Sequence, residues 1–424
     1  MQDNSFAGRT HRYELPNGTK LLVLENHANP TVSTFGVLKA GAYFNPPSRH
    51  GIASLTASML NKGSLHRTKL EIAKEMESAG AHLGFSASTF AVSIGGQALS
   101  RDFEMVSAIL TEQLTEPSFP ADELEKLKLR TLAALKQNQE ETRLRAVERL
   151  TQLVYPLESP FHQPTIEQLS TEVEAISVED LRQFYHLHYG ASSLTLVVVG
   201  DVDAAHVHRK IGELLGKWKG APAAEIDLPW TPVQKAPLRE LIALREKANA
   251  DVVIGHASGL RRSNPDYLAA MLANRALGQS TLSSRLGLKV RDEMGLTYGI
   301  NSSFMDSGLG DGPFVISVTV APENVETAIS TSREIVEEFI SSGIREDELR
   351  DEQSAWIGSF KVGLATNAGI AGQLASAEVY GLGPAYLDRF SDILGQITKA
   401  DVDEAIRRYF HPELSTTVIA GTFE

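Results

Sequence analysis

Short alternating segments and longer amphipathic stretches follow one another along the chain, and each spacing predicts its own secondary structure. An alternating apolar segment lies on each side of Asn17-Gly18, which predicts a β-hairpin near the N-terminus. Longer stretches with helical spacing occur in both halves. Because strands come in runs and helices in runs, we predict an α+β fold rather than a doubly wound α/β fold.

The order of these predicted elements repeats along the chain. The segment ISVEDLRQFYHLHYGASSLTLVVVGDV, from Ile176, lies without a gap over ITKADVDEAIRRYFHPELSTTVIAGTF, from Ile397, at a shift of 221 positions. Asp180 falls on Asp401 in this alignment. Each copy has the pattern of a capped helix, a short turn and a β-branched strand. An internal repeat of this length indicates tandem homologous domains.

The repeat and the composition between its copies predict where the domains end. A long helical pattern from Asp122 lies over another from Asp347. The stretch 219–237 between the copies is rich in proline and alanine and predicts an extended linker. We therefore expect domains at 1–218 and 238–424, each a mostly antiparallel mixed sheet packed with helices.

Composition narrows the function classes. The chain has 424 residues, more than one hydrophobic core usually organises. Its net charge of −13 argues against a nucleic-acid partner, and the lack of cysteine excludes disulfides and thiolate metal sites. The sequence contains neither a long apolar run nor an N-terminal signal-peptide pattern. We expect a cytoplasmic location without membrane contact, or a periplasmic one if a leader has been removed.

The segment HGIASLTASMLNKGS, from His50 to Ser64, resembles the signature helix of the pitrilysin and mitochondrial processing peptidase family, the inverzincins. Zinc-bearing members carry H-x-x-E-H there, with two histidines as ligands and the glutamate as general base. The positions that match the family frame are Gly51, Ala53, Leu55, Met59, Lys62 and Gly63. The resemblance implies the two-domain fold of that family.

The three functional positions of that motif are substituted in this chain. Ser54 and Ser58 stand where the histidines would be, and Ala57 replaces the glutamate. A serine hydroxyl is a poor zinc ligand, and alanine cannot transfer a proton. We expect no metal in this chain. The resemblance places zinc in a homologous partner subunit.

The family's third zinc ligand is a glutamate further along the chain. Glu140 or Glu141 could occupy that position, but Ala133 and Ala134 stand where acidic residues are common in the family. A lone carboxylate does not make a metal site. A solvated helix face is therefore the favoured interpretation of both glutamates.

The segment 276–304 resembles the family's C-terminal motif, in which an arginine and a tyrosine lie seven residues apart. Arg291 and Tyr298 hold that spacing. The resemblance implies that both contact the substrate peptide at the zinc site, the tyrosine as a donor to developing negative charge. The alternative is an arginine paired with Asp292 or Glu293 and a tyrosine in a strand. Gly295 is expected to turn the backbone between the helix and the strand that carry the pair.

Two further predictions concern substrate binding. Arg285 lies in the same motif; we expect it mainly to anchor the preceding glycine–serine loop and give it a lower rank as a substrate contact. The segment 80–96 looks similar to the family strand whose open edge pairs with substrate backbone, with Ser86, Ala87 and Ser88 near its centre. Its alternation is also what any half-buried strand shows.

These observations predict the metal-free subunit of a heterodimeric zinc metalloendopeptidase. Such a chain is inactive alone and supplies Arg291 and Tyr298 to peptides held with a zinc-bearing homologue. A structural or substrate-recognising subunit without catalytic contribution is the second interpretation. An inactive homodimeric binding protein is the third.

Overall fold

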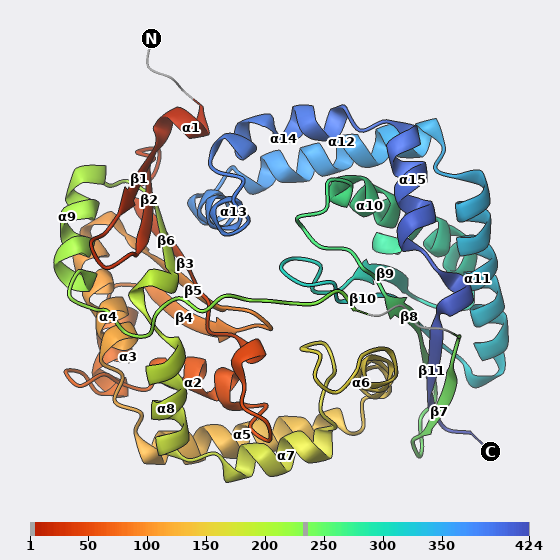
Figure 1. Cartoon of the computed structure of the whole chain (residues 1–424), viewed down its shortest axis with the longest axis horizontal. Coiled ribbons are helices and arrows are strands. Elements are labelled where there is room, and N and C mark those ends of the chain that lie inside the picture. The colour runs from red at the N-terminus through yellow and green to blue at the C-terminus, as the bar shows by residue number, and fades with distance from the viewer. Residues whose placement is uncertain (1–4, 232–235, 424) are drawn as a thin grey trace. The chain divides into compact units, whose positions relative to one another are not determined.

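The computed structural model describes residues 5–231 and 236–423 and divides the chain into two compact units, each described here by itself (Figure 1). The first unit holds the described residues up to Leu132, with Gln168–Asp227 and Ser359–Phe390. The second holds Ala133–Glu167, Leu228–Gly358 and the described residues from Ser391 onward. Neither unit is continuous in sequence.

The first unit is built on a six-stranded sheet in the order β1-β2-β6-β3-β5-β4. Only the β2–β6 pair is parallel. The strands are β1 Thr10–Glu14, β2 Lys20–Glu25, β3 Thr31–Leu38, β4 His82–Ala87, β5 Val92–Leu99 and β6 Leu194–Gly200. The predicted hairpin at Asn17-Gly18 is confirmed by the β1–β2 pairing, and Gly18 adopts a φ of 87°, which favours glycine.

Helices cover this sheet and complete its core. They are α1 Phe6–Arg9, α2 Ile52–Leu60, α3 Lys69–Ser78, α4 Phe103–Thr115, α8 Val178–His188, α9 Ala204–Leu215 and α13 Asn367–Val379. Three others run across a unit boundary: α5 Ala121–Asn138, α7 Ile166–Ala175 and α14 Ala385–Gly395. Leu55 and Met59 of α2 are buried with Ile94 of β5 in one apolar cluster. The burial of α2 against the sheet fixes the orientation of its remaining, polar face.

The second unit repeats the first with a five-stranded sheet in the order β7-β11-β8-β10-β9. Its strands are β7 Arg239–Ala243, β8 Ala250–Ala257, β9 Ile300–Phe304, β10 Pro313–Val320 and β11 Thr416–Gly421. Its helices are α6 Thr142–Val154, α10 Tyr267–Asn274, α11 Val325–Ser342 and α15 Lys399–Tyr409, together with most of α12 Glu346–Gly363, which also runs across a unit boundary. The order of these five strands corresponds to the order β2-β6-β3-β5-β4 in the first sheet. Two mostly antiparallel sheets packed with helices confirm the predicted α+β fold.

The internal repeat reappears at the level of single hydrogen bonds. Ser177 caps α8 in a capping box with Asp180, and Thr398 caps α15 in the same way with Asp401. Val418 of β11 lies between β7 and β8, and its counterpart in β6 lies between the equivalent strands β2 and β3. Local capping signals and strand register are therefore both duplicated.

One pair of equivalent helices is exchanged between the sequence halves. Helix α6, from the first half, packs on β8 and β11 of the second unit, whereas α13, from the second half, packs on β3 and β6 of the first. The exchanged helices are fixed by ion pairs. Arg149 of α6 binds Glu240 at 2.7 Å, and the buried carboxylate of Glu378 in α13 binds Arg12 at 2.8 Å.

The predicted linker, 219–237, includes residues 232–235, which lie outside the described residues. The described part contains neither helix nor strand. Arg261 donates to the carbonyls of Leu228 and Pro229, and its guanidinium lies 4.0 Å from the ring centroid of Trp230. The buried carboxylate of Asp311 binds Arg261 in turn at 2.8 Å. This end of the linker is therefore held on the second unit by a buried ion pair. No helix in the described part of the chain is long and apolar enough to span a bilayer.

The core of the second unit contains a buried histidine that stays neutral. The Nδ1 atom of His256 donates to the carbonyl of Ala257 at 2.9 Å, and its Nε2 atom accepts from the backbone N–H of His411 at 3.2 Å. Burial lowers the pKa of His256 to about 4 from the ordinary 6.5. A proton on Nε2 would face the N–H of His411 and break that hydrogen bond.

Acidification from pH 7 to pH 4 is therefore expected to destabilise the protein through His256. Below pH 6.5 the unfolded chain takes up a proton that the folded chain refuses, so stability falls as the pH drops toward 4. The loss from this residue amounts to roughly 3 kcal/mol at pH 4. Urea unfolding across this range compares the wild type with His256→Gln, which cannot titrate. Parallel pH profiles for the two proteins would show that His256 carries no such penalty.

Candidate functional site

The three substituted positions of α2, the helix that resembles the zinc-binding helix, differ from one another in exposure. Gly51 precedes the helix, and a Cβ there would lie 2.7 Å from a methyl group of Val173, so only glycine fits. The side chain of Ser54 is exposed and that of Ser58 is half-buried, whereas Ala57 is fully buried. The accessible groups of this face are thus two hydroxyls one helical turn apart.

These donors do not fit a catalytic zinc ion. Zinc sites use imidazole, thiolate or carboxylate ligands, and α2 offers only neutral hydroxyls. The nearby imidazole of His50 is engaged, because its Nδ1 atom lies 2.7 Å from the carboxylate of Glu172. Within residues 5–231 and 236–423, no three histidine, aspartate or glutamate side chains gather in a metal-binding group.

The two candidate third ligands lie between helices. Glu140 pairs with Lys247 at 2.9 Å, and Glu141 is the N-cap residue of α6 without a side-chain capping bond. Both side chains are exposed. The prediction of a solvated helix face was therefore wrong in detail, because the helical pattern breaks at this point. Both glutamates belong to the second unit, whereas α2 belongs to the first.

The segment 80–96 forms a hairpin rather than the single strand predicted for it. Strand β4 ends at Ala87, and β5 begins at Val92. Ser88 makes the turn, since its N–H donates to the carbonyl of Ala91 at 2.7 Å and its hydroxyl donates to the same oxygen at 3.0 Å. Of the three residues placed near a strand centre, Ser86 and Ala87 end β4 and Ser88 lies outside it. Their contact with substrate stays a prediction.

Strand β4 leaves one edge of the first sheet open. It pairs with β5, and among the described residues no strand covers its other edge. Because Ser88 and Ala91 form a hydrogen-bonded pair, alternation turns the backbone groups of Ser86 toward β5. The N–H and C=O groups of Leu83, Phe85 and Ala87 therefore face outward, where an added strand would meet them.

At the equivalent edge of the second sheet, β9, side chains engage outward carbonyls. Alternation from the hydrogen bond between Met305 and Pro313 turns the carbonyls of Ile300 and Ser302 outward. The hydroxyl of Thr281 donates to the Ile300 carbonyl at 3.2 Å, and the amide of Asn274 donates to the Ser302 carbonyl at 3.3 Å. The duplicated sheets thus differ at this edge, because side chains engage these two outward carbonyls of β9.

The motif with the predicted arginine and tyrosine contains two π-helical segments, at Arg275–Gln279 and Gly287–Glu293. Arg291 lies near the end of the second, and its guanidinium pairs with Asp292, which is the alternative that the sequence left open. Gly295 then turns the chain with a φ of 63°, a left-handed conformation that glycine adopts without strain. Single-turn π-helical segments are frequently found at functional sites.

Tyr298 is the most exposed of the large hydrophobic side chains in the described part of the chain, at 99%. The strand expected to carry it begins only at Ile300, so this part of the prediction was wrong. The cause is Thr297, whose hydroxyl accepts from the N–H of Gly299 and donates to the carbonyl of Thr319. The sequence interpretation missed Thr297, although a threonine hydroxyl that bonds the backbone N–H two residues later is a known local pattern.

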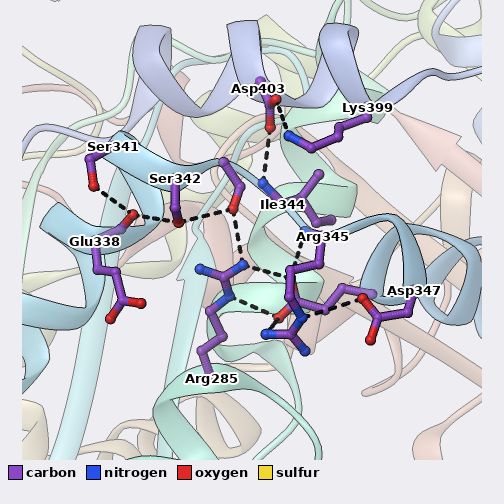
Figure 2. Close-up of polar contacts among 11 residues, drawn as sticks. Arg285, Glu338, Ser341, Ser342, Ile344, Arg345, Asp347, Lys399 and Asp403 are labelled. Atoms are coloured by element: carbon purple, nitrogen blue, oxygen red, sulfur yellow. Dashed lines mark hydrogen bonds and ion pairs between the residues drawn. The ribbon is translucent and has the colours of Figure 1, made fainter.

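Arg285 is engaged in a partly buried ion pair (Figure 2). It donates to the carboxylate of Glu348 at 2.8 and 2.6 Å and to the carbonyl of Gly343 at 3.0 Å. Its guanidinium also lies 4.4 Å from the ring centroid of Phe339. Arg285 therefore anchors the α11–α12 connection rather than the glycine–serine loop before it. A role in substrate binding stays a prediction, and it would require Glu348 to release the guanidinium.

Two family profiles match the chain in sequence. Residues 21–165 match the insulinase family, peptidase family M16, and residues 175–355 match the peptidase M16 inactive domain. An uncharacterised zinc protease of Streptomyces coelicolor is 23% identical over 425 residues, covering 97% of this chain and 90% of the relative. A non-peptidase homologue of Helicobacter pylori is 24% identical over 338 residues, covering 79% and 76%.

Similarity extends to subunits of larger enzymes and to a solved structure. The beta subunit of the mitochondrial-processing peptidase of Caenorhabditis elegans is 23% identical, covering 77% of this chain and 71% of the subunit. A probable alpha subunit from Arabidopsis thaliana is 28% identical, covering 54% and 42%. The crystal structure of a peptidase M16 inactive domain from Pseudomonas fluorescens superimposes with a TM-score of 0.89 at 25% identity over 98% of each chain.

Proposed function

This chain belongs to peptidase family M16, and on that premise we propose that it is the metal-free subunit of a two-chain zinc peptidase. A homologous partner with an intact H-x-x-E-H motif supplies the zinc, its ligands and the general base. This chain binds the extended peptide and directs Arg291 and Tyr298 to it. It has no peptidase activity alone.

The observation that carries this proposal is the combination on the first unit of a helix without metal ligands and an open strand edge beside it. Helix α2 packs next to β4, whose outward backbone groups are free. Pairing with such an edge reads backbone rather than side chains, so it suits extended peptides of many sequences. Because side chains engage the outward carbonyls of Ile300 and Ser302 in β9, we favour β4 as the place for that pairing.

The partner is proposed from chemistry and from the relatives. Ser54, Ala57 and Ser58 can neither hold zinc nor transfer the proton that peptide hydrolysis requires. Relatives of this chain include alpha and beta subunits of mitochondrial-processing peptidases, which supports an assembly of two homologous chains. We place this assembly in the cytoplasm, with peptides as its substrates.

This proposal predicts the behaviour of the isolated chain. Purified alone, it is expected to contain less than stoichiometric zinc and to leave a quenched fluorescent peptide intact. Mixed with a homologue that carries an intact H-x-x-E-H motif, it is expected to raise cleavage well above the level of that homologue alone. Metal analysis, gel filtration and the peptide assay measure the three quantities.

The same experiment separates the rival interpretation of a structural or recognition subunit, which the non-peptidase relative favours. Such a subunit would still bind peptide and partner, but cleavage would be insensitive to Arg291→Ala and Tyr298→Phe. Stoichiometric zinc together with peptide cleavage by the isolated chain would overturn the proposal.

A further inference from the structure

The side chain of Thr297, the residue before Tyr298, takes the place of a backbone partner where strand β9 of the second sheet would continue. If the β9–β10 ladder continued, Gly299 would lie opposite Thr319 and their backbone groups would bond directly. Instead the hydroxyl of Thr297 lies between them. It accepts the N–H of Gly299 at 3.1 Å and donates to the carbonyl of Thr319 at 2.6 Å.

The hydroxyl of Thr297 holds the backbone around Tyr298 in a conformation outside the strand. Two backbone groups that would have extended β9 are satisfied by Thr297, so the strand stops at Ile300 at no cost in unpaired polar groups. The residue between Thr297 and Gly299 is thereby excluded from the alternation of the sheet. Its ring projects into solvent, and its hydroxyl makes no hydrogen bond within the described chain.

We infer that Thr297 is a positioning residue that presents the hydroxyl of Tyr298 to bound peptide. This inference rests on the proposed function, because it needs a peptide that Tyr298 contacts. The chemistry is specific to a hydroxyl of this reach. Valine has the shape of threonine but can neither accept from Gly299 nor donate to Thr319, whereas serine can do both.

Thr297→Val is expected to let Gly299 bond directly to Thr319, which extends β9 and draws Tyr298 toward the sheet. In the complex with the zinc-bearing partner, kcat should fall by about tenfold with little change in KM, because the donor is displaced while the binding edge at β4 is untouched. Thr297→Ser should restore kcat. In a Tyr298→Phe background, Thr297→Val should cause no further loss, since the two residues act as one unit.

A second readout tests the geometry without any activity. Chymotrypsin should cleave the isolated chain after the exposed Tyr298, at similar rates in the wild type and Thr297→Ser, and about tenfold more slowly in Thr297→Val, because cleavage needs a mobile, accessible loop. Thr327→Val, at an exposed position of α11, is the matched control and should change neither readout.

The outcomes are distinguishable. Slower proteolysis and lower kcat in Thr297→Val, both restored by serine, support the inference. Unchanged proteolysis, or a failure of serine to restore it, overturns the positioning geometry. If Tyr298→Phe lowers kcat but Thr297→Val does not, the inference fails while the proposed function stands. If neither substitution changes kcat, the catalytic role proposed for Tyr298 fails, and the inference that rests on it falls too.

Discussion

Replacing Arg285 with alanine is expected to destabilise the protein by about 2–3 kcal/mol, because it removes two charge-assisted hydrogen bonds from the partly buried carboxylate of Glu348. Both side chains are 13% exposed, and two hydrogen bonds join them. Burial alone would raise the pKa of Glu348, but the hydrogen bonds from Arg285 and from the backbone N–H of Arg345 outweigh it and lower the pKa. The carboxylate is therefore charged at neutral pH, and its stabilisation is lost as the pH falls through that lowered value.

Equilibrium unfolding in urea measures this loss, and an exposed ion pair provides its control. Arg182 and Glu179 lie 3.8 Å apart with half of the arginine and most of the glutamate side chain in solvent, so Arg182→Ala should cost less than about 1 kcal/mol. The double variant Arg285→Met with Glu348→Leu should recover much of the stability, since it removes both charges from the partly buried site. Equal costs for the two arginines would mean that the Arg285–Glu348 pair is not even partly buried in solution.

Tyr298→Phe is expected to lower turnover of the two-chain enzyme by about 10²-fold while changing peptide binding much less. The substitution removes one hydroxyl donor from the oxygen that becomes negative in the tetrahedral intermediate. A donor that acts only on that charge contributes to the transition state and not to the ground state. Because the side chain is almost fully exposed, its loss should leave the folded chain intact.

Steady-state kinetics of the reconstituted pair separate these effects. Tyr267→Phe serves as the control, since its ring keeps its contact with Arg262 and the substitution removes only a hydroxyl from a different site. Turnover equal to that of the wild type would remove Tyr298 from the mechanism. A rise in KM alone would assign it to binding.

Local signals in the sequence predicted much of the fold. The capping boxes at Ser177 and Thr398 and the turn at Asn17-Gly18 all lie where the residue types require them. The exchange of α6 and α13 was not predictable, because tandem repeats present two similar sheets to two similar helices. Local pattern does not specify which copy of the helix packs on which sheet.

The parts of the site that depend on which residue occupies a position could be predicted from the sequence. The parts that depend on the geometry of turns could not. The substitutions at Ser54, Ala57 and Ser58 are visible in the sequence alone. The turn at Ser88 has no glycine, proline, asparagine or aspartate, and a serine hydroxyl is a weaker turn signal than any of these. At Ser88 and at Thr297 a side-chain hydroxyl replaces a backbone partner, and such replacements depend on geometry that a pattern of apolar positions does not contain.

The exchange of helices also determines how the chain tolerates being cut. A fragment that ends in the linker would retain α6 without the sheet on which it packs, and would expose the faces of β3 and β6 that α13 covers. Neither half is therefore a complete folding unit, and the two are expected to survive only when expressed together. An ancestor of half this length, in which each copy packed its equivalent helix on the sheet of the other copy, would have been an obligate dimer. Fusion of its genes would have made that dependence permanent within one polypeptide.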